Sequence, residues 1–300
     1  MTKPLNGVLT ALATPFDQDE QLDIPTLRKI VDRSIDGGVA GVVAGGSTGE
    51  FASLSSDERI QLVDTIVQHT AGRVPVIAQT GATTTREAIR LSRAAQKCGA
   101  DVLMLVAPYY EALTLAETVA YIKDVTASVE LPIMLYNIPA ATGLNLDADT
   151  IGGLAREIDQ IKYVKDSSAN WEQGLQLIHH HSDAIQTFIG WDSYTYSALV
   201  EGAVGVMAGA ANVVPAELVA VHRAISDGDL HGAFKEWKRV YPVIDALLSA
   251  PFIAAVKTGL RCQGLPAGIP RRPLSDLSPD AALRIKEALS VLASTETGHI

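Results

Sequence analysis

Two residues of this chain combine the chemistry and the placement needed to form and use a Schiff base. Lys165 lies near the end of the apolar run 161–166, and Tyr136 closes the apolar run 131–136. A lysine in an apolar pocket is partly desolvated, which disfavours its ammonium form and leaves free amine to attack a carbonyl carbon. A phenol beside that amine can relay the protons that imine chemistry moves. The pair predicts covalent catalysis through Lys165, and the competing interpretation is a solvated surface lysine.

These side chains must be positioned by the elements that carry them, and the sequence alternates short apolar runs with amphipathic segments. The runs are apolar almost throughout, which suits strands of a parallel sheet covered by helices. Eight such units match a closed (β/α)8 TIM barrel, and the count favours it over a doubly wound open sheet. The candidate strands are 7–13, 41–44, 74–79, 102–106, 133–136, 162–165, 186–189 and 205–207.

The pattern changes after the eighth run. The periodic segments beyond residue 213 all have helical spacing, and no further strand pattern follows. We therefore expect a barrel over residues 1–213 that carries the active site and a helical C-terminal region over residues 214–300.

Composition excludes several classes of function. The 300 residues include 24 Lys+Arg and 34 Asp+Glu, giving a net charge of -10 without a basic block, so nucleic acid is not an expected partner. No apolar run reaches the ~18 residues of a membrane span, so we expect no membrane association. Cys98 and Cys262 lack the spacing of a disulfide framework or a zinc site, which favours a reducing, cytoplasmic location.

The loops after the strands are where a barrel of this kind carries its chemistry. Segment 45–50 (GGSTGE) follows the second run. Its glycines let the backbone approach a ligand, and its amides and the hydroxyls of Ser47 and Thr48 could hold a carboxylate. The competing interpretation is a plain turn. Further candidate segments at strand ends are 107–110, 190–192 and 208–212.

Together these segments resemble a known family, the pyruvate-type class I aldolases and lyases that include dihydrodipicolinate synthase and N-acetylneuraminate lyase. The resemblance covers nearly the whole chain and rests on the motifs 46–50 (GSTGE), 108–110 (PYY), 136–139 (YNIP) and 164–166 (VKD). It implies a (β/α)8 barrel with a helical C-terminal region, a homotetramer built as a dimer of dimers, and an imine between a lysine and pyruvate or a similar 2-oxo acid. The second substrate is an aldehyde, and neither a metal nor an organic cofactor is implied.

The resemblance also implies a role for each candidate site residue. Lys165 matches the imine-forming lysine, and Tyr136 matches the tyrosine that transfers protons at the bound substrate. Ser47 and Thr48 match the hydroxyl pair that binds the carboxylate and links the tyrosines in a relay, and Tyr110 matches a tyrosine from the adjacent subunit. Weaker matches to substrate-binding positions are Gly190, Asp192, Met207 and Gly209.

Two departures from the family pattern bear on the substrate. In the synthase branch, the loop after the tyrosine carries an arginine that binds a substrate carboxylate, and here that position holds Ala141. In the sialic-acid lyase branch an acidic residue follows the aspartate, whereas Ser193 follows Asp192. We therefore expect cleavage, condensation or dehydration of a sugar-derived or similar 2-oxo acid. The alternative is 4-hydroxy-tetrahydrodipicolinate (dihydrodipicolinate) synthase.

Two other classes of function compete with a lyase. Segment 45–49 (GGSTG) fits the G-x-S-x-G elbow of serine hydrolases, but an elbow needs a helix directly after the serine, and the helical signal begins near Ser55. A non-catalytic binding protein on an aldolase scaffold is compatible with the fold, although retention of Lys165 and Tyr136 argues against it. The histidine tract 179–181 has no partner carboxylate at a metal-binding spacing, so a solvated helix end is favoured there.

Overall fold

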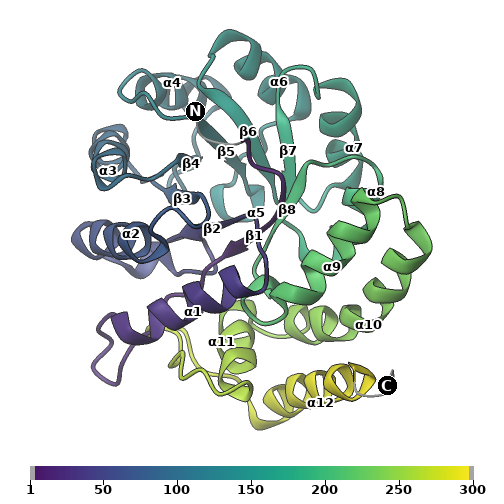
Figure 1. The fold of residues 1–300 in the computed structure, drawn as a ribbon. Coiled ribbons are helices and arrows are strands. Elements are labelled where there is room, and N and C mark those ends of the chain that lie inside the picture. Colours follow the sequence, from purple (N-terminus) through teal and green to yellow (C-terminus); the bar gives the residue numbers. More distant parts are fainter. Residues whose placement is uncertain (1–3, 297–300) are drawn as a thin grey trace.

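A computed structural model describes residues 4–296, in which eight parallel strands close into a barrel in the order β1 to β8 (Figure 1). Strand β8 pairs with β1, so the sheet has no free edge. The predicted (β/α)8 fold is therefore confirmed. The strands are β1 (Gly7–Ala11), β2 (Gly41–Ala44), β3 (Val76–Gln79), β4 (Val102–Val106), β5 (Ile133–Asn137), β6 (Ile161–Asp166), β7 (Gln186–Ile189) and β8 (Gly205–Ala208).

Helices alternate with the strands and surround the barrel. Short 3-10 turns, η1 (Phe51–Ser53), η2 (Asp192–Tyr194) and η3 (Ala210–Asn212), follow β2, β7 and β8. The helices are α1 (Ile24–Asp36), α2 (Ser56–Thr70), α3 (Thr85–Cys98), α4 (Leu115–Thr126), α5 (Pro139–Thr142), α6 (Ala148–Glu157), α7 (Trp171–His180), α8 (Thr195–Val200), α9 (Pro215–Ser226), α10 (Leu230–Leu248), α11 (Phe252–Cys262) and α12 (Pro279–Glu296).

Side-chain caps define where several helices begin. At the start of α2, Ser55 accepts a hydrogen bond from the Glu58 amide, and the Glu58 carboxylate accepts one from the Ser55 amide. Thr114 and Glu117 form the same reciprocal pair at the start of α4. Each cap satisfies amides that the first helical turn leaves unpaired, a contribution of about 1 kcal/mol.

The strand boundaries differ from the predicted ones where the backbone finds other partners. Strand β3 begins at Val76 because Pro75 has no amide hydrogen, although its carbonyl accepts from the Val42 amide. Strand β1 ends at Ala11, since two residues later the Ala13 amide donates to the Asn212 side chain at 2.9 Å. The apolar pattern extends past both boundaries, where the Leu12 amide still donates to the Val43 carbonyl and the Val42 amide to the Pro75 carbonyl.

The barrel interior is filled by side chains that alternate along each strand. Leu9, Ile77, Met104 and Phe188 belong to one buried cluster inside the sheet. A larger cluster lies between the sheet and the helices. Tyr163 of strand β6 also belongs to this interior cluster. Lys165 follows two residues later on the same face of the strand, so it points into the barrel near the carboxyl end of β6.

After β8, the chain contains helices and loops only, up to residue 296. Helix α9 packs against β1 and α10, and α10, α11 and α12 pack on one another beside the barrel (Figure 1). The division of the chain after residue 213 stays a prediction. Within residues 4–296, no helix combines the length and the apolar character required to cross a membrane.

Candidate active site

A cavity of about 470 Å³ lies at the carboxyl ends of the strands and collects most of the candidate residues. Its lining draws on six strand ends or the loops after them, and on the C-terminal helices. Eight of the nine predicted site residues line it, namely Ser47, Thr48, Tyr136, Lys165, Gly190, Asp192, Met207 and Gly209. Tyr110 does not. The catalytic and binding roles of these residues stay predictions.

Lys165 and Tyr136 are neighbours across two paired strands. The register of β5 and β6 places them opposite each other, and the Lys165 Nζ lies 4.1 Å from the centre of the Tyr136 ring. Their exposed fractions are only 4% and 3%. Lys162, by contrast, lies at an irregularity in the β5–β6 register, is exposed and pairs with Asp159 at 2.7 Å. The two lysines of β6 therefore lie in different surroundings, Lys165 in the cavity and Lys162 exposed.

Ser47 connects this pair to the loop after β2. The Ser47 Oγ lies 3.2 Å from the Tyr136 hydroxyl, and either atom can donate. The Glu50 amide donates to the Ser47 carbonyl at 3.0 Å and closes a tight turn, which presents Ser47 and Thr48 to the cavity. The Thr14 hydroxyl donates to the Gly49 carbonyl at 2.7 Å and holds the turn from beneath. Two hydroxyls beside a buried amine can bind a carboxylate next to a reacting carbonyl.

Two glycines leave the space that the cavity needs. A Cβ at Gly190 would lie 2.6 Å from the Lys165 Cε and even closer to the Ser167 hydroxyl. A Cβ at Gly209 would collide with the Phe252 ring and lie 3.0 Å from the Thr48 hydroxyl. A side chain at either position would therefore force the neighbouring side chains of the cavity to move.

Asp192 lies in the η2 turn after β7 and is 6% exposed. Its Oδ1 accepts a hydrogen bond of 2.7 Å from the Ala210 amide, which ties the loop after β7 to the loop after β8. Burial raises the pKa of Asp192 to about 6, and the Ala210 amide and the charge of Lys165 partly oppose that rise. The carboxylate therefore has a structural partner as well as a place in the cavity lining.

Tyr110 is 84% exposed and lies away from the Lys165 cavity. Its neighbour Tyr109 packs edge-on against Phe51, with ring centres 5.3 Å apart. The role of Tyr110 in an adjacent subunit, and the tetramer itself, stay predictions.

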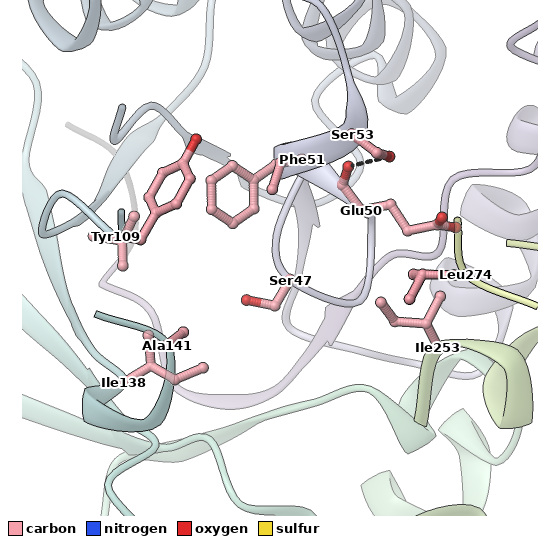
Figure 2. Close-up of a pocket in the computed structure, with 11 residues that line it drawn as sticks. Ser47, Glu50, Phe51, Ser53, Tyr109, Ile138, Ala141, Ile253 and Leu274 are labelled. Atoms are coloured by element: carbon pink, nitrogen blue, oxygen red, sulfur yellow. Dashed lines mark hydrogen bonds between the residues drawn. The ribbon is translucent and has the colours of Figure 1, made fainter. Parts of the chain in front are cut away.

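A second cavity of about 240 Å³ adjoins the first and shares Ser47, Ile138 and Ile253 with it. Figure 2 shows Tyr109 and Phe51 on one side of Ser47, Ile138 and Ala141 on another, and Ile253 with Leu274 on a third. Its lining is mostly apolar. Ala141, where the synthase branch has an arginine, therefore faces an apolar space.

Sequence reasoning missed several residues of the lining. Ser167 follows Lys165 by two positions and shares its face, so strand alternation could have indicated it. Its hydroxyl donates to the Gly190 carbonyl at 3.2 Å. Leu248 of α10 and Phe252 and Ile253 of α11 also line the cavity. No local signal marks them, because their contribution depends on how the C-terminal helices pack.

The geometry disfavours the competing functions. Ser47 contacts a tyrosine, no histidine among residues 4–296 lines either cavity, and α2 begins only at Ser56, so a hydrolase elbow is absent from this segment. In the histidine tract, His179 contacts Glu201 at 3.1 Å and His181 contacts Asp149 at 3.2 Å. In the part of the chain that the structure describes, no cluster of three or more His, Cys, Asp or Glu side chains is suited to a metal ion.

Comparison with known proteins gives a consistent result. Residues 4–292 match the model of the dihydrodipicolinate synthetase family. The chain is 36% identical over 283 residues to a 4-hydroxy-tetrahydrodipicolinate synthase of Oceanobacillus iheyensis, covering 94% of this chain and 96% of that one. A second such synthase, from Halalkalibacterium halodurans, is 35% identical, with 95% and 97% covered.

A solved structure of the chloride-inhibited dihydrodipicolinate synthase from Acinetobacter baumannii, complexed with pyruvate, superposes with a TM-score of 0.93. It is 32% identical in sequence, and the match covers 97% of this chain and 99% of that one. The sequence match, the shared barrel and the lysine–tyrosine geometry agree. The chain therefore belongs to the dihydrodipicolinate synthetase family and is a Schiff-base lyase of the aldolase type.

Proposed function

We propose that the protein forms an imine between Lys165 and pyruvate or a related 2-oxo acid. It uses this imine to cleave, condense or dehydrate a substrate whose aldehyde-derived part carries no charge. The observation that carries the proposal is the buried Lys165 amine, 4.1 Å from the Tyr136 ring, in a cavity that also presents the Ser47 and Thr48 hydroxyls. The pyruvate-bound structure of the Acinetobacter baumannii relative supports the choice of 2-oxo acid.

The chemistry follows from what an imine does to the neighbouring bond. The Lys165 amine adds to the 2-oxo carbon and water leaves, giving the imine. When the C3–C4 bond of the bound substrate breaks, its electron pair is stored in an enamine, and the proton of the C4 hydroxyl is taken up as the aldehyde leaves. Condensation is the reverse, and dehydration loses a C3 proton and then the C4 hydroxyl. Tyr136 moves these protons, and its hydroxyl, 3.2 Å from that of Ser47, supports this role.

The part of the site that would hold the aldehyde lacks the cation that an aldehyde with a carboxylate group requires. The lining of the two cavities contains only one Lys or Arg side chain within residues 4–296, and that is Lys165. At the matching position, Ala141 lies beside Ile138 in the lining of the second cavity, which Tyr109 also lines (Figure 2). In the cavity around Lys165, Ser167 offers a hydroxyl that could contact a substrate hydroxyl group. Uncharged or hydroxylated aldehydes, including sugar-derived ones, suit this arrangement.

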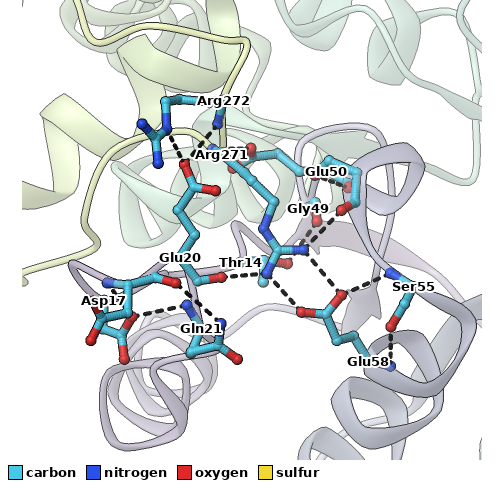
Figure 3. A network of polar contacts seen from close by, with 12 residues as sticks. Thr14, Asp17, Glu20, Gln21, Gly49, Glu50, Ser55, Glu58, Arg271 and Arg272 are labelled. Carbon is cyan, nitrogen blue, oxygen red and sulfur yellow. Dashed lines mark hydrogen bonds and ion pairs between the residues drawn. The ribbon is translucent and has the colours of Figure 1, made fainter.

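Two arginines of the C-terminal region, Arg271 and Arg272, are the alternative cations, and both already form ion pairs with other residues (Figure 3). Arg271 contacts the Glu58 carboxylate at 2.7 Å and donates to the Ser53 carbonyl at 2.8 Å. Arg272 is paired with Glu20 at 2.7 Å. Neither arginine lines either of the two cavities, so neither replaces the missing guanidinium.

A second candidate function is favoured by the names of the relatives. The curated relatives described above are 4-hydroxy-tetrahydrodipicolinate synthases. The corresponding reaction here would be condensation of pyruvate with aspartate semialdehyde, whose carboxylate is the group that an arginine would bind. Loss of a charged hydrogen-bonding partner costs ~2–3 kcal/mol, or near a hundredfold in rate or affinity.

Direct assay of both reactions distinguishes the two functions. We expect poor condensation with aspartate semialdehyde and measurable release or uptake of a 2-oxo acid with uncharged aldehydes. Ala141→Arg should raise the condensation rate, whereas Ala140→Arg is a matched control because Ala140 lies next to it on α5 but outside both cavity linings. Efficient condensation by the unmutated protein would contradict the main proposal and establish the synthase function.

A further inference from the structure

A fully buried ion pair lies directly behind the loop after β2. The Lys257 Nζ and the Glu50 Oε1 are 2.6 Å apart, and their side chains are 0% and 1% exposed. Burying two charges costs solvation free energy that their attraction often fails to repay, so apolar residues could stabilise such a position equally well. Stability alone therefore does not explain why both charges are present.

Glu50 belongs to the turn that presents Ser47 and Thr48. Its backbone is left-handed, with φ +58°, a conformation that is costly for a residue with a Cβ. Its amide donates to the Ser47 carbonyl, and the Ser53 hydroxyl donates to the Glu50 carbonyl at 2.9 Å. Glu50 is therefore hydrogen-bonded directly to the backbone of Ser47, whose hydroxyl lines the substrate cavity together with that of Thr48.

The C-terminal region binds both carboxylate oxygens of Glu50. Lys257 of α11 contacts Oε1, and the Arg271 amide donates to Oε2 at 2.9 Å, so each oxygen has its own partner (Figure 3 shows the Arg271 side). Lys257 is held in turn by the Ile269 carbonyl at 2.9 Å and by the Phe16 ring, whose centre is 4.3 Å away.

Helix α11 also contributes directly to the cavity. Ile253 lies one turn before Lys257 on the same face of the helix, and it lines both cavities. Neither Glu50 nor Lys257 lines the cavity around Lys165, whereas Glu50 lines the adjoining second cavity. One helix thus places an apolar side chain at the substrate and anchors the turn that carries Ser47 and Thr48.

We propose that Glu50 and Lys257 are positioning residues through which the C-terminal helices hold the Ser47–Thr48 turn in the geometry that binds the carboxylate of the 2-oxo acid. The proposal rests on the imine function of Lys165. The pair acts on binding of the 2-oxo acid, and it leaves the imine chemistry on Lys165 and Tyr136 unchanged.

The test measures pyruvate trapping on Lys165 by borohydride over a range of pyruvate concentrations, in the full chain. In Lys257→Met we expect the half-saturating pyruvate concentration to rise about tenfold, whereas turnover at saturating substrate stays within about twofold, the pattern of a lost binding contribution. Because this variant leaves Glu50 buried without its partner, Glu50→Gln/Lys257→Met is measured as well. It removes both charges, should fold, and should show the same rise.

Asp276→Asn is the matched control. It breaks the pair between Arg261 and Asp276, 2.7 Å apart and partly exposed in the same C-terminal region, without touching the β2 loop. Its half-saturating concentration should equal that of the unmutated protein. An equal rise in this control, or an unchanged value in the folded double variant, would overturn the positioning role alone. Absence of any adduct on the unmutated protein would overturn the imine function together with it.

Discussion

Replacement of Asp192 by asparagine should change how the stability of the protein depends on pH. The buried carboxyl has a pKa of about 6 against an ordinary value of 3.8. Between these two values the unfolded chain releases the proton and the folded chain keeps it, so the folded state loses relative stability as pH rises. The difference between the two pKa values corresponds to about 3 kcal/mol. Above about pH 6 that cost is fully present, and below about pH 4 it disappears.

Asparagine keeps an oxygen that can accept from the Ala210 amide but cannot ionise. The free energy of unfolding of Asp192→Asn minus that of the unmutated protein should therefore increase by about 3 kcal/mol from about pH 4 to about pH 7. Urea unfolding at several pH values measures it. Asp183→Asn is the control, because Arg156 lowers the pKa of Asp183 below its ordinary value of 3.8 and its contribution to stability is lost only as pH falls below about 4, so its difference should stay nearly constant from about pH 4 to about pH 7. A pH-independent difference for Asp192→Asn would refute the reasoning.

Three further predictions concern the site. Tyr136→Phe should still form the imine but should slow turnover by roughly a hundredfold, the usual size of a lost acid/base group. Borohydride trapping measures imine formation, and steady-state rates without borohydride measure turnover. Gly190→Ala should abolish trapping on Lys165 in a folded protein, because the new Cβ would occupy space 2.6 Å from the lysine Cε and closer still to the Ser167 hydroxyl; unimpaired trapping would show that the loop yields. Tyr110→Phe should reduce activity only in assembled protein, which activity and sedimentation measured together would test, and a fully active monomer would count against it.

The candidate site residues near the strand ends were predictable because local patterns mark them. Lys165 and Tyr136 each close an apolar run, and parallel strands bring the ends of such runs to one edge, so their proximity followed once a barrel was inferred. Ser47 lay in a glycine-rich turn after a strand, which is a local signal as well. The structure places it 3.2 Å from Tyr136.

The contribution of the C-terminal helices was not predictable in the same way. Glu50 and Lys257 are separated by more than two hundred positions, and nothing in the residues around either one indicates that they meet. Ile253 belongs to a helical segment with an ordinary apolar periodicity, which would fit any packed helix and does not mark a cavity-lining residue. Strand ends shifted for a related reason, since the Ala13 amide finds a partner in Asn212, far along the chain. Packing between distant segments decides these features, and periodicity does not encode it.

The most direct test of the imine mechanism is borohydride reduction in the presence of pyruvate, followed by peptide mass spectrometry. We predict a single covalent adduct on Lys165, the buried lysine 4.1 Å from the Tyr136 ring. Lys162, exposed on the same strand and paired with Asp159, is the internal control and should stay unmodified. An adduct on Lys162 in place of Lys165, or no adduct with any 2-oxo acid, would contradict the mechanism.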